Sequence, residues 1–207
     1  MNIYVESNFM LELALLQEQS GSCSNILQLC RQEKAHLVLA AFSIAEPYET
    51  LGRRSRERNT LADSLDSELR QLSRTQPYTE RINTLQEVTG FLVRSAEEER
   101  SRLTQVMKEV LGIAEVIPLD SAVITSASGL EESLGLSPQD AIVLASVLKH
   151  LEESDDEPSC FLNRNTKDFD DPDIVERLGE HNCSLLPRFD DALRYLRNVL
   201  GIEDLPA

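Results

Sequence analysis

The sequence predicts an α/β protein in which a parallel sheet is covered by helices on both faces and a helical hairpin is inserted into the chain. Short apolar runs alternate with apolar residues at helical spacing, a pattern typical of strands that are buried on both faces. The stretch from about 52 to 110 is instead rich in Glu, Arg, Leu and Gln and is interrupted only near Pro77. We therefore expect a single α/β/α domain over 1–207 with a helical hairpin inserted at about 52–110.

The first part of the chain predicts two strand–helix units. Residues 3–5 and 37–40 are short apolar runs of the kind found in buried strands. After the first run, apolar residues recur at helical spacing: Phe9, Met10, Leu13 and Leu16. Ser24 is expected to cap the next helix. Ser43 and Glu46 have the spacing of a capping box for the helix that follows the second strand.

The α/β pattern resumes after the predicted hairpin. The remaining strands are expected at 116–117, 159–162 and 183–186. A helix is expected after Asp120, and Ser137 is expected to cap another, with Pro138 in its first turn. A last amphipathic helix carries Leu193, Leu196 and Leu200.

The composition is that of an ordinary soluble globular protein, with 207 residues, 41% hydrophobic and 27% charged. The four cysteines have no CxxC spacing, so we expect small buried side chains in a reduced, cytoplasmic setting. No apolar run approaches the roughly 20 residues that a membrane-spanning helix needs. The N-terminal segment has no basic region of the kind that precedes a signal peptide core. We therefore expect no membrane association.

The net charge of −16 argues against a general nucleic-acid binder, which needs a basic surface. The basic residues are nevertheless concentrated, because residues 45–110 carry 11 Lys and Arg against 12 Asp and Glu. Four of them follow one another closely: Arg53, Arg54, Arg56 and Arg58. They form either a solvated helix face or a basic rim that holds a phosphate backbone.

Four acidic residues lie just past a predicted strand or at the start of a predicted helix: Glu6, Glu46, Asp140 and Asp168. Strand ends and helix starts meet at one edge of an open α/β sheet, where such proteins bind ligands. Two carboxylates about 4 Å apart repel each other by roughly 4 kcal/mol at an effective dielectric of 20. A cluster of this kind is typical of a site for a hard divalent cation.

Three of these acids also have local interpretations. Glu46 fits the acid of a capping box, and Asp140 would favour a helix N-terminus through the helix dipole. Asp168 could be a turn or capping residue before a helix that starts near Pro172. Glu6 ends a buried strand and makes no recognisable cap, so the metal interpretation rests most on Glu6 and on the joint pattern.

The motifs around these acids resemble those of PIN domains. They are Val5-Glu6-Ser7-Asn8, Ser43-Ile44-Ala45-Glu46, Leu136-Ser137-Pro138-Gln139-Asp140-Ala141 and Asn163-Arg164-Asn165-Thr166-Lys167-Asp168-Phe169. The resemblance covers about two thirds of the chain and leaves out the predicted hairpin, which is larger than in compact toxin-like members. The usual first acid of the family is Asp, whereas this chain has Glu6. Asn165 stands where many relatives carry a further acid.

The resemblance implies a nuclease that hydrolyses phosphodiester bonds, most often in RNA. It implies Mg²⁺ or Mn²⁺ held by Glu6, Asp140 and Asp168, with Glu46 as a ligand directly or through water. Ser7 and Asn165 would support the metal site or contact phosphate. A toxin role would bring an antitoxin as partner, and the family also suggests a homodimer.

Two other classes remain open at this point. The first is a PIN-like module that binds RNA or protein without catalysis, in keeping with the change to Glu6 and the strong acidity. The second is a receiver-like signalling domain, which also gathers acids at one edge of a parallel sheet. It would need a phosphate-accepting Asp after a central strand and a Lys after a later one, for which Asp120 and Lys167 are the nearest matches.

Overall fold

The protein is built around a five-stranded parallel sheet with strand order β3-β2-β1-β4-β5. The computed structural model describes the backbone of residues 1–154, 157–165, 169 and 171–202, and the side chains of the same residues apart from 79–81, 83, 84 and 86. The strands are β1 (Asn2–Val5), β2 (His36–Ala40), β3 (Glu115–Ile117), β4 (Ser159–Leu162) and β5 (Cys183–Leu186). All five predicted strands are therefore confirmed, and so is the parallel α/β/α class.

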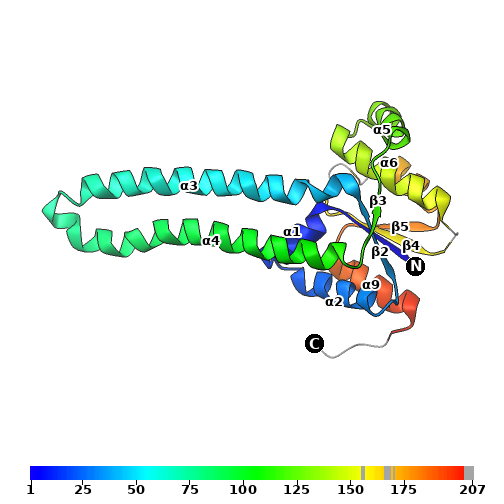
Figure 1. Ribbon diagram of the computed structural model, residues 1–207, viewed down its shortest axis with the longest axis horizontal. Coiled ribbons are helices and arrows are strands. Elements are labelled where there is room, and N and C mark those ends of the chain that lie inside the picture. The colour runs from blue at the N-terminus through cyan, green and yellow to red at the C-terminus, as the bar shows by residue number, and fades with distance from the viewer. Residues whose placement is uncertain (155–156, 166–168, 170, 203–207) are drawn as a thin grey trace.

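Helices cover both faces of the sheet (Figure 1). One face carries α1 (Ser7–Leu15), α2 (Ser20–Arg31) and α9 (Phe189–Leu200). The other face carries α5 (Ser121–Leu134), α6 (Pro138–Glu153) and α8 (Pro172–Gly179). Because β1 lies between β2 and β4, the chain segments that leave these three strands lie side by side at one edge.

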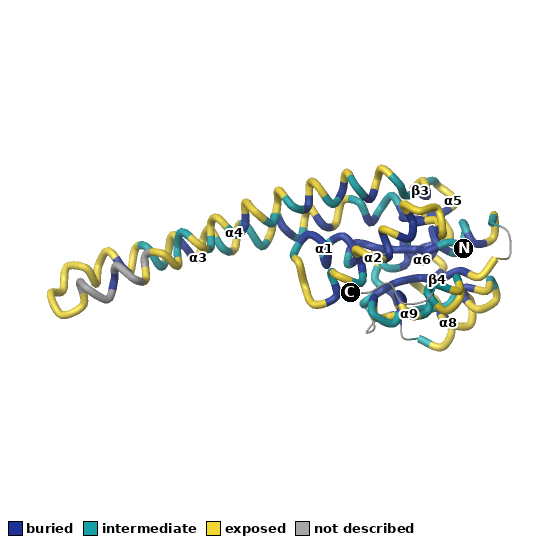
Figure 2. Tube along the Cα trace, turned by 90° about the horizontal axis from the view of Figure 1, so that it is seen from below, coloured by how far each residue is buried: buried dark blue, intermediate teal, exposed yellow. Residues whose placement is uncertain are grey.

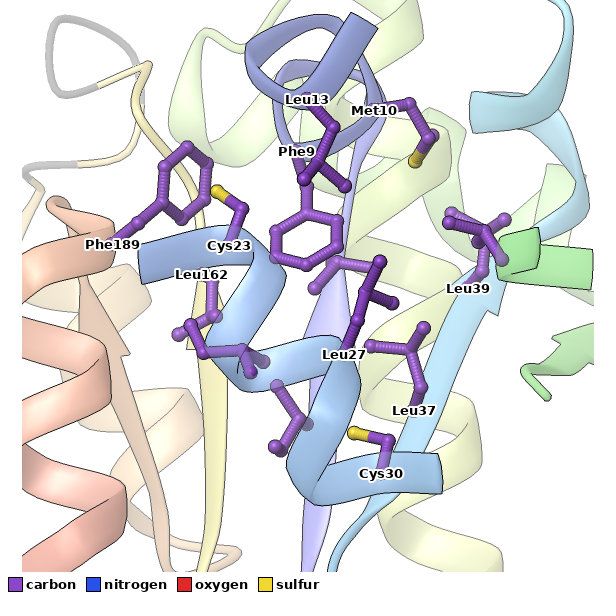
Figure 3. Packing of buried hydrophobic residues seen from close by; sticks show 14 of the residues in the cluster. Phe9, Met10, Leu13, Cys23, Leu27, Cys30, Leu37, Leu39, Leu162 and Phe189 are labelled. Carbon is purple, nitrogen blue, oxygen red and sulfur yellow. The ribbon is translucent and has the colours of Figure 1, made fainter. Parts of the chain in front are cut away.

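The alternation of side chains along the strands divides the core into two clusters. Ile3 and Val5 face α1 and α2, whereas Tyr4 between them faces α6. Figure 3 shows the first cluster, in which side chains from α1, α2, β2, β4 and α9 point toward one another. The central strands β1, β2 and β4 are buried on both faces, as their continuous apolar runs predicted.

The segment between β2 and β3 forms the predicted helical hairpin. It consists of a short 3-10 helix η1 (Ala41–Ile44), then α3 (Glu46–Leu72), η2 (Gln76–Tyr78) and α4 (Thr79–Leu111). The hairpin projects far from the α/β body (Figure 1), and much of its outer part is exposed (Figure 2). Its base joins the core through Leu103, Met107 and Val110 of α4. The chain thus carries a long helical arm directly next to the carboxyl edge of β2.

An ion pair links the two helices of the arm. The Arg58 guanidinium on α3 lies 2.9 Å from the Glu99 carboxylate on α4 and 3.2 Å from the Ser95 hydroxyl. Both charged side chains are largely buried, at 27% and 15% exposure. Arg58 therefore has a structural role in the hairpin, which separates it from its three neighbouring arginines.

Two predicted caps are wrong. Ser24 does not begin a helix, because α2 starts one turn earlier at Ser20. Ser43 and Glu46 form no capping box, because η1 occupies the turn before α3 and the capping position falls on Ala45. The Ser43 hydroxyl is instead buried without a hydrogen-bond partner among the described residues.

Other local predictions are confirmed. The Asp120 carboxylate accepts a hydrogen bond from the Val123 amide, and the Ser137 hydroxyl accepts one from the Asp140 amide, so both residues cap helices. Cys23, Cys30, Cys160 and Cys183 are all buried and none is in a disulfide. In the described part of the chain, no helix is both long and apolar enough to cross a membrane.

Candidate active site

Three of the four predicted acids line one pocket at the carboxyl edge of the sheet. Glu6 directly follows β1, Glu46 begins α3, and Asp140 lies in the first turn of α6. The pocket has a volume of about 530 Å³ and is also lined by Arg54 and Asn165. The fourth acid, Asp168, lies outside the described residues.

Glu6 is the most buried of the three predicted acids that line this pocket, with 5% of its surface exposed. It occupies the capping position of α1 but makes no side-chain cap, so its carboxylate is directed to other partners. Asn8 donates a hydrogen bond to Glu6 Oε1. Burial raises the pKa of Glu6 from 4.5 to about 8; the Asn8 hydrogen bond opposes this, and the charges of Glu46 and Asp140 add to it. Glu6 therefore carries a proton at neutral pH while no cation balances the site.

Asp140 has both a local and a site role. Its Oδ2 accepts a 2.6 Å hydrogen bond from the Ser137 hydroxyl, which in turn accepts one from the Asp140 amide at 3.2 Å. Its Oδ1 accepts a 3.4 Å hydrogen bond from the side-chain amide of Asn165, which follows β4. The helix cap therefore orients the carboxylate, and one oxygen is directed to the strand edge.

Thermal melts of Asp140→Asn can separate these two roles. If Asp140 only favours its helix, we expect the variant to be less stable by about 0.3–1 kcal/mol with or without metal. If it belongs to the carboxylate cluster, the metal-free variant gains stability because repulsion falls. The unmodified protein should then gain roughly 2.7 kcal/mol from Mn²⁺ at 100 times its dissociation constant, and the variant should lose most of that gain. Equal metal shifts in both proteins, with the variant lower in each, contradict a metal role for Asp140.

Glu46 is exposed and lies on the boundary between two pockets. It lines the acidic pocket and also a neighbouring pocket along the start of α3. Its capping-box interpretation is excluded by the position of η1. An acid in the first turn still favours the dipole of α3.

An ion pair between a partly exposed arginine and a buried glutamate, which the sequence did not predict, forms one wall of the pocket. Arg164, which follows β4, contacts Glu12 of α1 through its guanidinium. Glu12 is only 1% exposed, and its second oxygen accepts a 2.6 Å hydrogen bond from the Gln19 amide. The available signal was an acid within the apolar face that contains Phe9 and Leu13. Its partner lies 152 residues away, so the sequence alone does not identify it.

The four predicted arginines have different surroundings. Arg54 lines the acidic pocket, whereas Arg53 and Arg56 line the neighbouring pocket. Arg58 is held by Glu99, as described above.

Ser7 is buried at 2% exposure in the first turn of α1 and is not among the described residues that line the acidic pocket. Asn165 is placed where it contacts Asp140.

The donor set of the acidic pocket fits a hard divalent cation. Carboxylate oxygens are the ligands that Mg²⁺ and Mn²⁺ prefer. Burial is the largest cause of the raised pKa of Glu6, and the negative charges of Glu46 and Asp140 raise it further, so these carboxylates lie near enough to Glu6 to act on it. Within the described residues, which leave out Asp168, no group of three or more His, Cys, Asp or Glu is arranged to hold a metal ion. Glu6, Glu46 and Asp140 would therefore have to move closer together, or be joined by further ligands.

The parallel sheet and the acids at its carboxyl edge define an α/β protein with a candidate active site at that edge. A family model for the PIN domain matches residues 3–169, and the chain belongs to this family. PIN domains are generally nucleases and typically use divalent metal ions. No curated protein and no solved structure matches the chain.

Family membership also decides against the receiver-like hypothesis. Asp120, its nearest candidate for a phosphate acceptor, caps α5 and forms a 2.6 Å ion pair with Lys149. Lys167, its candidate lysine, lies outside the described residues.

Proposed function

We propose that this protein is an endoribonuclease that depends on Mg²⁺ or Mn²⁺ and hydrolyses phosphodiester bonds in single-stranded RNA. The observation that carries the proposal is the pocket that Glu6, Glu46 and Asp140 line at the carboxyl edge of the sheet. Membership of the PIN family supports the general chemistry. The specificity for RNA and the identity of the metal are the further steps of the proposal.

The residues of the pocket would have different roles in this reaction. Glu6 and Asp140 would hold the cation, with Glu46 as a ligand directly or through water, and the predicted ligand Asp168 stays part of this proposal. When bound, such an ion polarises a phosphodiester and lowers the pKa of an attacking water. Ser137 orients the Asp140 carboxylate through its 2.6 Å hydrogen bond. Arg54, in the same pocket, offers a positive charge to a substrate phosphate.

A second candidate is a PIN-like module that binds RNA or protein without cleaving it. The specific observation in its favour is the pKa of about 8 at Glu6, which keeps this carboxyl protonated and a poor metal ligand at neutral pH. A cation that binds tightly enough would displace this proton, since a bound divalent ion is the largest local charge in such a site.

Cleavage of defined RNA separates the two candidates. We expect the purified protein to cleave single-stranded RNA with Mg²⁺ or Mn²⁺ at millimolar concentration and to lose this activity when a chelator is added. The measurement is gel analysis of a labelled RNA pool and a matched DNA pool. Binding without cleavage in either metal would support the binding module instead.

A toxin role with an antitoxin partner and a homodimer stay proposals from the family resemblance, and a cytoplasmic location stays a proposal from the spacing of the cysteines. Inspection of the neighbouring reading frames would test the antitoxin. Sedimentation of the purified protein would test the homodimer.

A further inference from the structure

A second pocket adjoins the acidic one along the base of the hairpin. It has a volume of about 670 Å³ and lies between η1, the first turns of α3, the turn after β3 and the start of α6. Glu46 and Gln139 line both pockets, so the two hollows meet at these residues. A chain that leaves the acidic pocket past Glu46 and Gln139 enters this second pocket.

The charge of the side chains that line the second pocket changes from negative to positive along α3. Glu46 and Glu49 line the part at the start of α3, and Arg53 and Arg56 follow one and two turns later. Arg53 and Arg56 are three residues apart and share one face of α3. Neither forms an ion pair within the described residues, in contrast to Arg58. Both guanidinium groups are thus available to an anionic ligand.

The side chain of Arg56 lies against the backbone of α3 at Gly52. The Arg56 Nη1 atom lies 3.6 Å from the position that a Cβ of Gly52 would occupy. The guanidinium of Arg56 therefore lies back along α3 toward the helix start and the acids. This orientation follows the usual direction of long side chains on a helix, toward its N-terminus.

Apolar side chains supply another part of the pocket wall. Phe42 of η1 is partly exposed, and Leu119, in the turn after β3, is 43% exposed. Aromatic and apolar surfaces beside arginines are the combination that binds unpaired nucleotides, with the base on the apolar surface and the phosphate on the cation. A base within a duplex is stacked and cannot reach such a wall, so the pocket favours a single strand.

We infer that this second pocket binds the nucleotide next to the scissile phosphodiester of a single-stranded nucleic acid, with its phosphate on Arg53 and Arg56 and its base against Phe42 and Leu119. The inference rests on the proposed function, because it assumes that a phosphodiester occupies the adjoining acidic pocket. It makes the base of the inserted hairpin part of the substrate site.

The test compares two double variants with the same change of charge. Binding of labelled eight-nucleotide RNA and DNA strands is measured by fluorescence anisotropy over a range of salt concentrations, with chelator present to prevent cleavage. Arg53→Gln/Arg56→Gln should weaken binding about tenfold or more. The slope of log affinity against log salt should become shallower by about 0.7, since the two arginines share one phosphate and each neutralised phosphate on a single strand contributes about 0.7. The control, Arg70→Gln/Arg74→Gln, removes two arginines toward the other end of the hairpin and should leave both quantities unchanged.

A strand with one abasic position tests the apolar wall. With the intact protein, moving the abasic position along the strand should weaken binding most at one site, next to the mapped cleavage position. Leu119→Ala should reduce this positional effect, because stacking on the wall is then weaker. An RNA and a DNA strand should respond alike, since none of these side chains reads a 2′-hydroxyl specifically.

The outcomes test nucleotide binding in the second pocket separately from the proposed nuclease activity. Unchanged affinity and salt slope in Arg53→Gln/Arg56→Gln overturn the inference, even if the protein cleaves RNA. A selective loss in this variant supports the pocket, even if the protein cleaves nothing and the proposed nuclease activity fails. An equal loss in Arg70→Gln/Arg74→Gln would indicate a general charge effect and would also overturn the inference.

Discussion

In the metal-free protein, Glu6 is expected to lower the free energy of unfolding by roughly 4–5 kcal/mol as pH rises. The variant Glu6→Gln is expected not to show this loss. In the folded protein the pKa of Glu6 is about 8, against 4.5 for an ordinary glutamate. Between these values the unfolded chain has released this proton while the folded protein still holds it. The contribution of Glu6 to stability is therefore full below about pH 4.5 and is lost as pH rises to about 8.

The measurement is urea unfolding in chelator from pH 4.5 to 8.5. The difference between the unmodified protein and Glu6→Gln isolates Glu6, because the other titrating groups are common to both. The charges of Glu46 and Asp140 act on Glu6, and Glu12, Arg54 and Arg164 line the same pocket. Glu18→Gln, at an exposed position, is the matched control and should keep the pH profile of the unmodified protein. Parallel profiles for Glu6→Gln and the unmodified protein contradict the prediction.

The same variant tests the role of Glu6 in the proposed activity. If Glu6 holds the cation, Glu6→Gln should lower cleavage by at least about 100-fold, since even residues outside the first ligand shell typically cost 10- to 100-fold. It should also lose most of the stabilisation by Mn²⁺ at neutral pH. Full activity in this variant would remove Glu6 from the catalytic site while leaving the pH prediction intact.

Arg164→Met is expected to lower the free energy of unfolding by about 3 kcal/mol. The variant leaves the Glu12 carboxylate, only 1% exposed, without its cationic partner, and breaking a buried ion pair typically costs about 3–5 kcal/mol. We place the effect at the lower end because Glu12 keeps its hydrogen bond from the Gln19 amide. Chemical denaturation at neutral pH measures it.

Arg31→Met is the matched control for this prediction. Arg31 pairs with Glu109 at 2.9 Å, but the two side chains are 48% and 41% exposed, so the pair should contribute less than about 1 kcal/mol. The double variant Glu12→Gln/Arg164→Met should recover part of the lost stability, because it no longer buries an unpaired charge. Equal losses from Arg164→Met and Arg31→Met would show that burial of Glu12 does not decide the energy.

Features of the fold that depend only on neighbouring residues were easier to predict from the sequence than features that depend on tertiary packing. The strand at 37–40 and the cap at Ser137 depend on neighbouring residues only, and both were predicted correctly. The cap at Ser43 was predicted wrongly because η1 inserts an extra turn, which depends on how the chain leaves β2. Glu6 and Asp140 were predicted to lie at one edge because strand ends and helix starts meet there in an open α/β sheet, and the structure places both in one pocket.

The sequence by itself determined where strands and helices follow one another along the chain, where the hairpin is inserted, and which acids lie at the edge of the sheet. Hydrophobic periodicity and helix capping, which carry this information, are encoded over a few residues. Only the tertiary structure decided which distant side chains meet. The strand order puts β4 beside β1, which brings Arg164 to Glu12. The packing of α3 against α4 brings Arg58 into an ion pair with Glu99, while Arg53 and Arg56 line a pocket beside the acids. Burial of Glu6 then sets its pKa, because desolvation depends on everything that surrounds a group and not on its neighbours in the chain.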